Sequence, residues 1–271
     1  MVPGASNRTL RRMLQQRRVR LNGRITTSAG AEVSSGDVVE IGKGVALPRR
    51  VRNIDILTED DDILVVHKPA GLLTVATPHE SERTAYAFLR EYVKQHDPAR
   101  KLLIVHRLDK YVSGLLVFAK SERVKLRLQA LFQKHQIQRK YWAIVEGRVE
   151  RREGTIRSHL AEDRFQRIRS TKDTTRGKEA VTHYRVLRRF SNLTSLEVTL
   201  ETGRKNQIRA HLSEIGHPIV GDRAYGSQID PLGRMGLHAY CLGFTHPTRG
   251  VPAFFETEPP PEFRRYLPTR G

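Results

Sequence analysis

The sequence contains a single cysteine, Cys241, among its 271 residues. One thiol cannot build a disulfide framework, so the cysteine content does not indicate a secreted protein. The longest apolar runs, such as LLIV at 102–105, are far too short to cross a bilayer, and the first residues lack the apolar centre of a signal peptide. We therefore expect a cytoplasmic protein without a membrane segment.

The spacings typical of metal sites are also missing. The eleven His residues are scattered, and neither His-Glu-x-x-His nor Cys-x-x-Cys occurs. Such spacings bring several ligands to one ion. We expect no metal site.

Acidic residues are scarce, because 29 Asp and Glu stand against 48 Lys and Arg, for a net charge of +19. A strongly positive field favours a polyanionic partner, and nucleic acid is the commonest one. The alternative is a basic surface without such a partner. A membrane-surface role is disfavoured, because the sequence has no long basic amphipathic helix with a bulky aromatic face.

The first 47 residues read as one unit. Leu10, Met13 and Leu14 share a face at helical spacing, and Val19 and Leu21 alternate as in a strand. Residues 1–52 hold eleven Lys or Arg against three acids, a net charge of +8. Arginine pairs bidentately with phosphate, so this helix presents either an RNA-contacting face or a solvated one. The candidate phosphate contacts are Arg11, Arg12, Arg17 and Arg18.

The arginine-rich helix, VRLNGR and VSSGDVVEI together resemble the S4 RNA-binding domain, a small α/β module, over residues 7–44. The segment LPRRVRN at 47–53 is typical of a linker. We expect an S4-like domain at 1–47, a linker at 48–58 and a second domain at 59–271.

From residue 54 onward, short β-rich runs alternate with helical patterns, which predicts an α+β fold with a large, mostly antiparallel sheet. Ser121 is the expected N-cap of a helix at 121–134, and Gly216 is the expected stop of a helix at 206–216. The tail at 258–271 is expected to lie loosely on the surface.

Asp109 is the only acid in the stretch VHRLDKYVSGLLVFAK at 105–120. It follows an apolar run and precedes another strand candidate, which places it on a turn between two buried strands. A rigid scaffold can hold a catalytic side chain at such a turn. An Asp here can equally cap the turn or pair with Arg107, and the spacing alone leaves both interpretations open.

The stretch HRLDKYVSGLLVFAK resembles the signature of the RluA-like pseudouridine synthases, in which the Asp of His-Arg-Leu-Asp is catalytic. Four more segments resemble motifs of that family, in the family's order: ILVVHKPAGLLT at 63–74, RKYWAIVEG at 139–147, TGRKNQIRAHLSEIGHPIVGDRAYG at 202–226 and LHAYCLGFTHP at 237–247. The resemblance spans nearly all of the chain after residue 58. It implies a pseudouridine synthase catalytic domain whose catalytic residues are Asp109, Tyr141 and Arg209.

The implied reaction breaks the bond between ribose and nitrogen 1 of uracil, turns the base and rejoins it through carbon 5. Nothing is oxidised and no group is transferred, so no cofactor is expected. Asp109 acts as a nucleophile or as a base toward the ribose, and both roles need the ionised carboxylate. Arg209 favours that charge, and Tyr141 lies against the flipped uracil.

Three more residues are expected to bind substrate. His106 and Arg107 hold a phosphate or fill the space that the extruded base leaves, and Lys68 shapes the bottom of the site. Ribosomal RNA is preferred over transfer RNA as the partner, because an S4 domain suits large structured RNA. A catalytically silent RNA-binding or ribosome-assembly protein is the alternative function. A monomer is expected.

The sequence departs from the family pattern at several positions. Val112 stands where the family usually has Thr, His67 where it has Asn, and Lys205 and Asn206 where it has Thr and His. None of these departures removes the Asp, Tyr or Arg, so they bear on the rate and on the RNA target.

Overall fold

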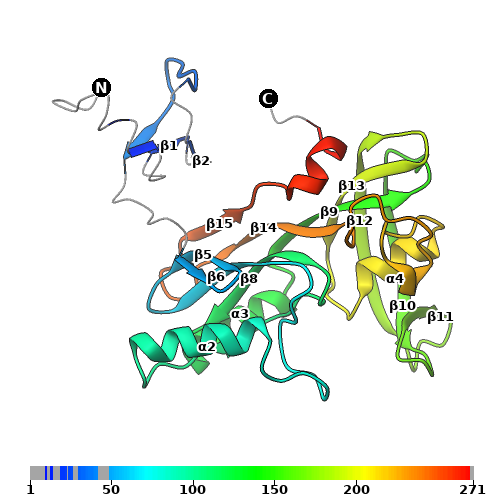
Figure 1. Ribbon diagram of the computed structural model, residues 1–271, viewed down its shortest axis with the longest axis horizontal. Helices are drawn as coiled ribbons and strands as arrows, with labels where there is room; N and C mark the ends of the chain where they lie inside the picture. Colours follow the sequence, from blue (N-terminus) through cyan, green and yellow to red (C-terminus); the bar gives the residue numbers. More distant parts are fainter. Residues whose placement is uncertain are drawn as a thin grey trace.

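One twelve-stranded sheet forms the body of the protein (Figure 1). The computed structural model describes residues 10, 13–14, 19–22, 24–26, 30–41 and 49–268. The strand order is β11-β10-β12-β13-β9-β14-β8-β6-β5-β4, with β15 paired to β14 and β7 paired to β8. The strands of this sheet are β4 (Arg49–Val51), β5 (Ile54–Glu59), β6 (Ile63–Lys68), β7 (Leu103–Ile104), β8 (Ser113–Ala119), β9 (Gln138–Glu146), β10 (Glu153–Glu162), β11 (Ile168–Thr171), β12 (Lys178–Arg189), β13 (Leu193–Leu200), β14 (Leu237–Thr245) and β15 (Pro252–Glu256).

The sheet is antiparallel except where β14 meets β8, which confirms the predicted α+β class with a mostly antiparallel sheet. That parallel pairing is short, with Ser113 opposite His238 and Gly114 opposite Ala239. A Cβ on Gly114 would lie 2.1 Å from the carbonyl oxygen of Ala239, and its φ is +126°. Glycine therefore lets the two halves of the sheet meet immediately after the turn that carries Asp109.

Three helices pack against this sheet: α2 (Ala85–His96), α3 (Glu122–Gln133) and α4 (Gln207–Glu214). Contacts place α3 against β8 and α4 against β10, β11 and β12. Ser121 caps α3 by accepting a hydrogen bond from the Val124 amide, as predicted. The predicted helix at 206–216 appears as α4, which ends shortly before Gly216 (φ +84°).

The core lies on both faces of the sheet because side chains alternate along its strands. On β9, Tyr141 and Ala143 join the cluster that includes buried residues of α2 and α4. Trp142 belongs to the opposite cluster, together with Phe263 and Tyr266 of the 3-10 helix η2 (Pro261–Tyr266). Phe263 is 0% exposed, so the predicted loose tail is wrong: its aromatic residues anchor it to the sheet.

The N-terminal part contains a separate three-stranded sheet in the order β2-β1-β3. Its strands are β1 (Val19–Leu21), β2 (Arg24–Ile25) and β3 (Val39–Ile41). Leu10, Met13 and Leu14 are helical, as the sequence predicts. The four candidate phosphate contacts Arg11, Arg12, Arg17 and Arg18 lie outside the described residues.

The predicted linker at 48–58 is corrected by the strands that occupy it. β4 and β5 lie almost entirely within this segment, and β5 pairs with β6 in the large sheet. The burial of Ile54 and Ile56 explains the pairing, because their side chains enter the main core. The large sheet therefore begins about ten residues before the expected boundary at 59.

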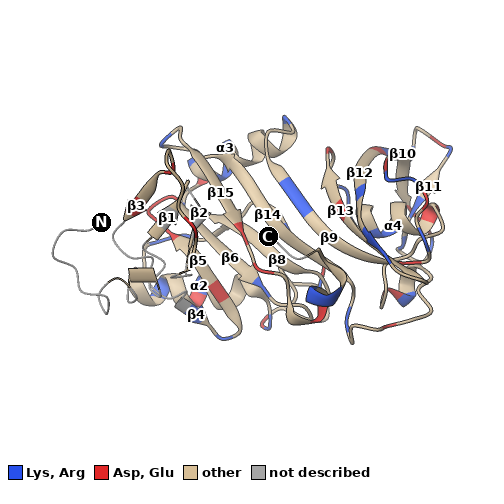
Figure 2. Cartoon of the chain, turned by 90° about the horizontal axis from the view of Figure 1, so that it is seen from above, with Lys and Arg blue, Asp and Glu red and all other residues tan. Residues whose placement is uncertain are grey.

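Lys and Arg are spread over the half of the sheet that carries α4. Figure 2 shows them on β9, β12 and α4 and around β10 and β11. Within the described part of the chain, no helix is long and apolar enough to span a membrane.

Candidate active site

Asp109 lies at the start of a tight turn between β7 and β8. The Val112 amide donates to the Asp109 carbonyl at 3.2 Å, and Leu108 and Val112 on either side are buried. The Asp109 side chain keeps 23% of its surface exposed. The turn thus holds the backbone firmly while it leaves the carboxylate open to a ligand, in the place the sequence predicts.

Arg209 of α4 meets this carboxylate, although the two residues are 100 positions apart. Its Nη1 lies 3.4 Å from Asp109 Oδ2. The other edge of the guanidinium donates twice to Asp222, from Nε to Oδ2 at 2.6 Å and from Nη2 to Oδ1 at 2.8 Å. A bidentate pair of this kind fixes the plane of the guanidinium. The sequence did not single out Asp222, although it lies in the segment GDRAYG.

The charge of Arg209 is secured by its partners. Burial acts to lower its pKa, but the hydrogen bonds and charge of Asp222, with the charge of Asp109, raise the pKa above its usual value. The Asp222 side chain is 0% exposed, so it depends on Arg209 as its counter-ion. Arg209 is therefore a permanent cation beside the Asp109 carboxylate.

Asn206 and Tyr225 complete the support of Arg209. Arg209 Nη1 donates to Asn206 Oδ1 at 3.1 Å, and the Asn206 amide donates to the Tyr225 hydroxyl at 3.2 Å. The guanidinium carbon lies 4.6 Å from the centre of the Tyr225 ring. Asn206 adopts a left-handed conformation (φ 51°), which Asn tolerates well. The departure from the family pattern at Asn206 thus places a hydrogen-bond acceptor on the catalytic candidate Arg209.

The other three residues that depart from the family pattern each lie in a different environment. Lys205 forms an ion pair with Glu162 at 3.0 Å. Val112 is buried in the main core. His67 lies 3.7 Å from Asp55, and burial lowers its pKa against the pull of that carboxylate.

Tyr141 projects from β9 and is only 7% exposed. Burial raises the pKa of its phenol; the charge of Arg139 opposes this rise, and the charge of Asp109 adds to it. The hydroxyl therefore stays protonated and can donate a hydrogen bond. The charge of Asp109 therefore acts on the Tyr141 phenol, and their common catalytic site stays a prediction.

Lys68 lies beneath the turn and does not face solvent. Its side chain is 0% exposed, and its ammonium donates to the carbonyls of Pro69 (2.8 Å), Leu72 (2.7 Å) and Lys110 (3.2 Å). Burial lowers its pKa to about 7, the charge of Asp109 acts to raise it, and that of Arg234 acts to lower it. Lys68 ties residues 69–72 to the turn of Asp109, and its enclosed amine cannot be a direct RNA contact. Its predicted substrate-binding role is therefore corrected to a supporting one.

His106 is also a supporting residue. Its Nε2 accepts a hydrogen bond from the Val117 amide at 3.1 Å, and its ring lies 4.8 Å from that of Phe132. Burial, aided by the charge of Arg139, lowers its pKa to about 3. A neutral imidazole engaged with β8 cannot attract a phosphate by charge, so this part of the prediction is wrong.

Arg107, the third residue expected to bind substrate, lies on the surface. Its side chain is exposed, two positions before Asp109. It makes no hydrogen bond or ion pair with any other described residue, so its guanidinium is available to a ligand. Arg139, two positions before Tyr141, has a buried Nε without a hydrogen-bond partner among the described residues, and its Nη2 donates to the Thr202 carbonyl at 3.3 Å.

A possible group of metal ligands occurs elsewhere in the described part of the chain. Asp60, Asp62 and His246 each bring a ligand atom within 4.8 Å of the others. Arg249 already pairs with Asp60 at 3.0 Å, and Thr248 donates to Asp62 at 2.5 Å. These contacts hold the loop after β14 against the turn after β5, which is a sufficient structural role for the group.

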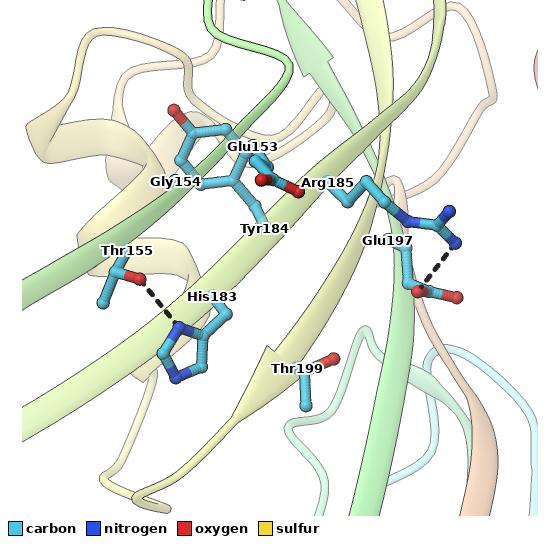
Figure 3. A pocket seen from close by; sticks show the side chains of 8 residues that line it. All are labelled: Glu153, Gly154, Thr155, His183, Tyr184, Arg185, Glu197 and Thr199. Carbon is cyan, nitrogen blue, oxygen red and sulfur yellow. Dashed lines mark hydrogen bonds and ion pairs between the residues drawn. The ribbon is translucent and has the colours of Figure 1, made fainter.

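A hollow of about 470 Å³ lies on β10, β12 and β13 (Figure 3). In this hollow, the Thr155 hydroxyl forms a hydrogen bond with His183 Nδ1 at 2.8 Å, and Arg185 donates a hydrogen bond to Glu197 at 3.1 Å. It contains none of the predicted site residues, and these polar groups already have partners within the protein. The chemistry therefore points to the Asp109 turn rather than to this hollow.

The chain is similar to known proteins over most of its length. The sequence profile of a family described as RNA pseudouridylate synthase matches residues 62–214. An uncharacterised RNA pseudouridine synthase of Aquifex aeolicus (strain VF5) is 33% identical over 280 residues, covering 97% of this chain and 88% of that protein. Ribosomal large subunit pseudouridine synthase D of Yersinia pestis is 33% identical over 279 residues, covering 93% of this chain and 82% of that protein.

A solved structure shares the fold. Human RNA Pseudouridylate Synthase Domain Containing 4 has a TM-score of 0.66 and 24% identity, covering 78% of this chain and 92% of that one.

Proposed function

The chain belongs to the RNA pseudouridylate synthase family and is an RNA pseudouridine synthase, and from this premise we propose that Asp109, Tyr141 and Arg209 form its catalytic centre. The observation that carries the proposal is the ion pair of Asp109 with Arg209, whose guanidinium is clamped by Asp222. The fixed cation thus faces a carboxylate that is 23% exposed, and such a carboxylate can reach the ribose of a bound nucleotide.

The reaction is an isomerisation whose atoms balance without a second reactant. The bond between the ribose and nitrogen 1 breaks, and the ribose then joins carbon 5 of the same uracil. Carbon 5 loses its hydrogen as a proton, and nitrogen 1 gains one. Asp109 serves as nucleophile toward the ribose or as the base that draws a ribose proton.

Tyr141 would contact the target base, and Arg107 would contact the RNA strand that carries it. The Tyr141 ring offers a stacking face to the detached uracil, and its protonated hydroxyl can donate a hydrogen bond. A uridine inside a helix must first leave the stack, which costs a few kcal/mol. The exposed Arg107 can offset part of that cost by pairing with a phosphate or occupying the vacated space.

We further propose structured ribosomal RNA as the substrate. The name of the Yersinia pestis relative, whose match covers 93% of this chain, supports the ribosomal large subunit as the source. Residues 1–47 would act as an S4-like RNA-binding domain ahead of the catalytic one, in a monomeric, cytoplasmic enzyme.

The test is the substitution Asp109→Asn, which is nearly isosteric and removes only the charge. We expect it to abolish pseudouridine formation while RNA affinity is retained. Tritium released from RNA labelled at carbon 5 of uridine measures the reaction, because that hydrogen is lost. Asp61→Asn is the matched control, since its carboxylate is 92% exposed and pairs only with Arg100 among the described residues. An Asp109→Asn protein with a near wild-type rate would disprove the catalytic assignment.

A further inference from the structure

An exposed aromatic ring stands at the corner of the turn that carries Asp109. The hydrogen bond from the Val112 amide to the Asp109 carbonyl closes a four-residue turn, with Lys110 and Tyr111 at its centre. Tyr111 is 53% exposed, whereas Leu108 and Val112 are buried. The ring is therefore presented to solvent by a backbone that is anchored on both sides.

The backbone beneath the ring is fixed from a second direction. The carbonyl of Lys110 accepts hydrogen bonds from the Gly71 amide at 2.9 Å and from the buried ammonium of Lys68 at 3.2 Å. A surface ring on such a support loses little conformational entropy when it binds a flat partner.

Charge also favours an anionic, aromatic partner at this corner. The Lys110 ammonium lies 5.3 Å from the centre of the Tyr111 ring. A base stacked on the ring brings its phosphate toward that ammonium. The ring and the ammonium together match the pairing of aromatic platforms and basic groups that binds unpaired nucleic acid.

We propose that Tyr111 is a stacking platform for the base adjacent to the target uridine in the RNA substrate. The inference rests on the proposed function, because the target base must enter the site between Asp109 and the buried Tyr141. Tyr111 is 53% exposed whereas Tyr141 is buried, so we assign to Tyr111 the base of a neighbouring nucleotide rather than the target uracil. The strength of stacking depends on the area of the rings and not on hydrogen bonds. A purine at this position should therefore bind more tightly than a pyrimidine.

Tyr111 has no structural duty that would obscure a test. It is absent from the hydrophobic clusters of the described residues, and its hydroxyl bonds none of them. Phe254 is a matched control, because it is 57% exposed and lies on β15, which pairs with β14 far from the Asp109 turn in sequence. Tyr111→Phe keeps the ring and removes the hydroxyl.

The experiment combines protein variants with a change in the RNA. The substrate is a stem-loop of large-subunit ribosomal RNA, either intact or with the base removed from one nucleotide beside the target uridine. Both KM and Kd are measured for the wild type, Tyr111→Ala, Tyr111→Phe and Phe254→Ala. One stacking contact of about 1–3 kcal/mol corresponds to a change of roughly 5- to 150-fold.

We expect Tyr111→Ala to raise KM and Kd by that factor, whereas Tyr111→Phe and Phe254→Ala stay close to the wild type. Removing the base that stacks on Tyr111, on one side of the target uridine, should raise the Kd of the wild type. The Kd of Tyr111→Ala should be the same for intact and base-deleted RNA. Equal values for Tyr111→Ala and the wild type would overturn the proposal, as would a base-removal effect that persists in the Ala variant. Absence of pseudouridine with the wild type would instead count against the proposed RNA target, and the Kd values would still judge Tyr111.

Discussion

Arg209 serves two carboxylates with one guanidinium. Its outer edge is clamped by the fully buried Asp222, and Nη1 is left to face Asp109 and Asn206. A cation held this way needs no rearrangement when substrate arrives, which is the main requirement of electrostatic preorganisation. The same clamp means that Arg209 supports the fold in addition to its proposed catalytic role, so a single substitution affects both.

A pair of substitutions separates them. Arg209→Met should destabilise the fold by about 3–5 kcal/mol, because it leaves Asp222 charged and buried without a partner. Adding Asp222→Asn should recover most of that loss, since the remaining amide carries no charge. Activity should stay low in both variants, because the cation beside Asp109 is gone. Urea unfolding and the tritium assay measure the two properties.

Either of two results would contradict this separation. A double variant with near wild-type activity would mean that Arg209 acts only as a structural partner of Asp222. A single variant of unchanged stability would mean that Asp222 is not dependent on its ion pair.

At the scale of elements, the joint between β8 and β14 determines where the site can form. The two strands pair over only two residue pairs, directly after the Asp109 turn. Gly114 provides the closest approach, and its backbone conformation is one that L side chains rarely adopt. The position of Asp109 relative to β9 therefore depends on a residue without a side chain.

Gly114→Ala should damage this joint. Backbone strain and the clash with the Ala239 carbonyl should together cost several kcal/mol, because each effect alone is worth about 1–3 kcal/mol. Gly216→Ala is the matched control: its φ is also positive, at +84°, but nothing lies within 4 Å of a Cβ there. We expect it to cost only about 1 kcal/mol. Denaturant unfolding of both variants measures the difference, and equal losses of stability would show that the approach to Ala239 is unimportant.

The sequence predicts those elements whose local pattern agrees with their burial. The run SGLLVFA of β8 is buried throughout, and the helix after Ser121 has both its cap and its stripe. Helix α2 was missed although Ala85, Leu89 and Val93 have helical spacing. Its Tyr86, Phe88 and Tyr92 favour strands, and this preference competes with the helical signal.

The strands at the basic end and the segment before 59 were harder to predict for another reason. β12 carries exposed Lys, Glu and Arg beside its buried residues, and β5 follows a run of charges, so both resemble loops in composition. These segments become strands because they pair with strands distant in the sequence, and a local sequence pattern contains no information about those partners.

The residues of the candidate site also fall into those that the sequence identifies and those that only the fold reveals. Asp109, Tyr141 and Arg209 were identified from motifs, and the structure brings Asp109 and Arg209 together. Asp222 and Asn206 gain their importance only from how α4 and the following loop fold onto Arg209. The sequence suggests that His106 and Lys68 are cations that bind RNA. Burial makes His106 neutral and encloses the Lys68 ammonium, so neither can pair with a phosphate.

At the scale of the whole molecule, part of the positive charge lies far along the chain from the proposed catalytic residues. Residues 1–52 carry +8 of the net +19, whereas the three proposed catalytic residues lie between 109 and 209. Phosphate contacts give affinity and orientation, and the site gives selectivity for the reacting base. The N-terminal arginines should therefore affect the salt dependence of RNA binding more than the reaction itself.

Replacing Arg11, Arg12, Arg17 and Arg18 together by Gln in the full chain tests this division. Removing one phosphate-binding cation should reduce the slope of log affinity against log salt by roughly 0.7–0.9, so the fourfold substitution should reduce it by about 3. The variant should bind long ribosomal RNA more weakly at low salt and respond less to added salt. The control replaces the same four residues by Lys, which keeps the charge and should keep most of the slope. Titrations at several salt concentrations measure both variants. If the Gln variant kept the wild-type affinity and slope, the four arginines would be a solvated surface, and the RNA affinity would have to come from the basic strands around α4.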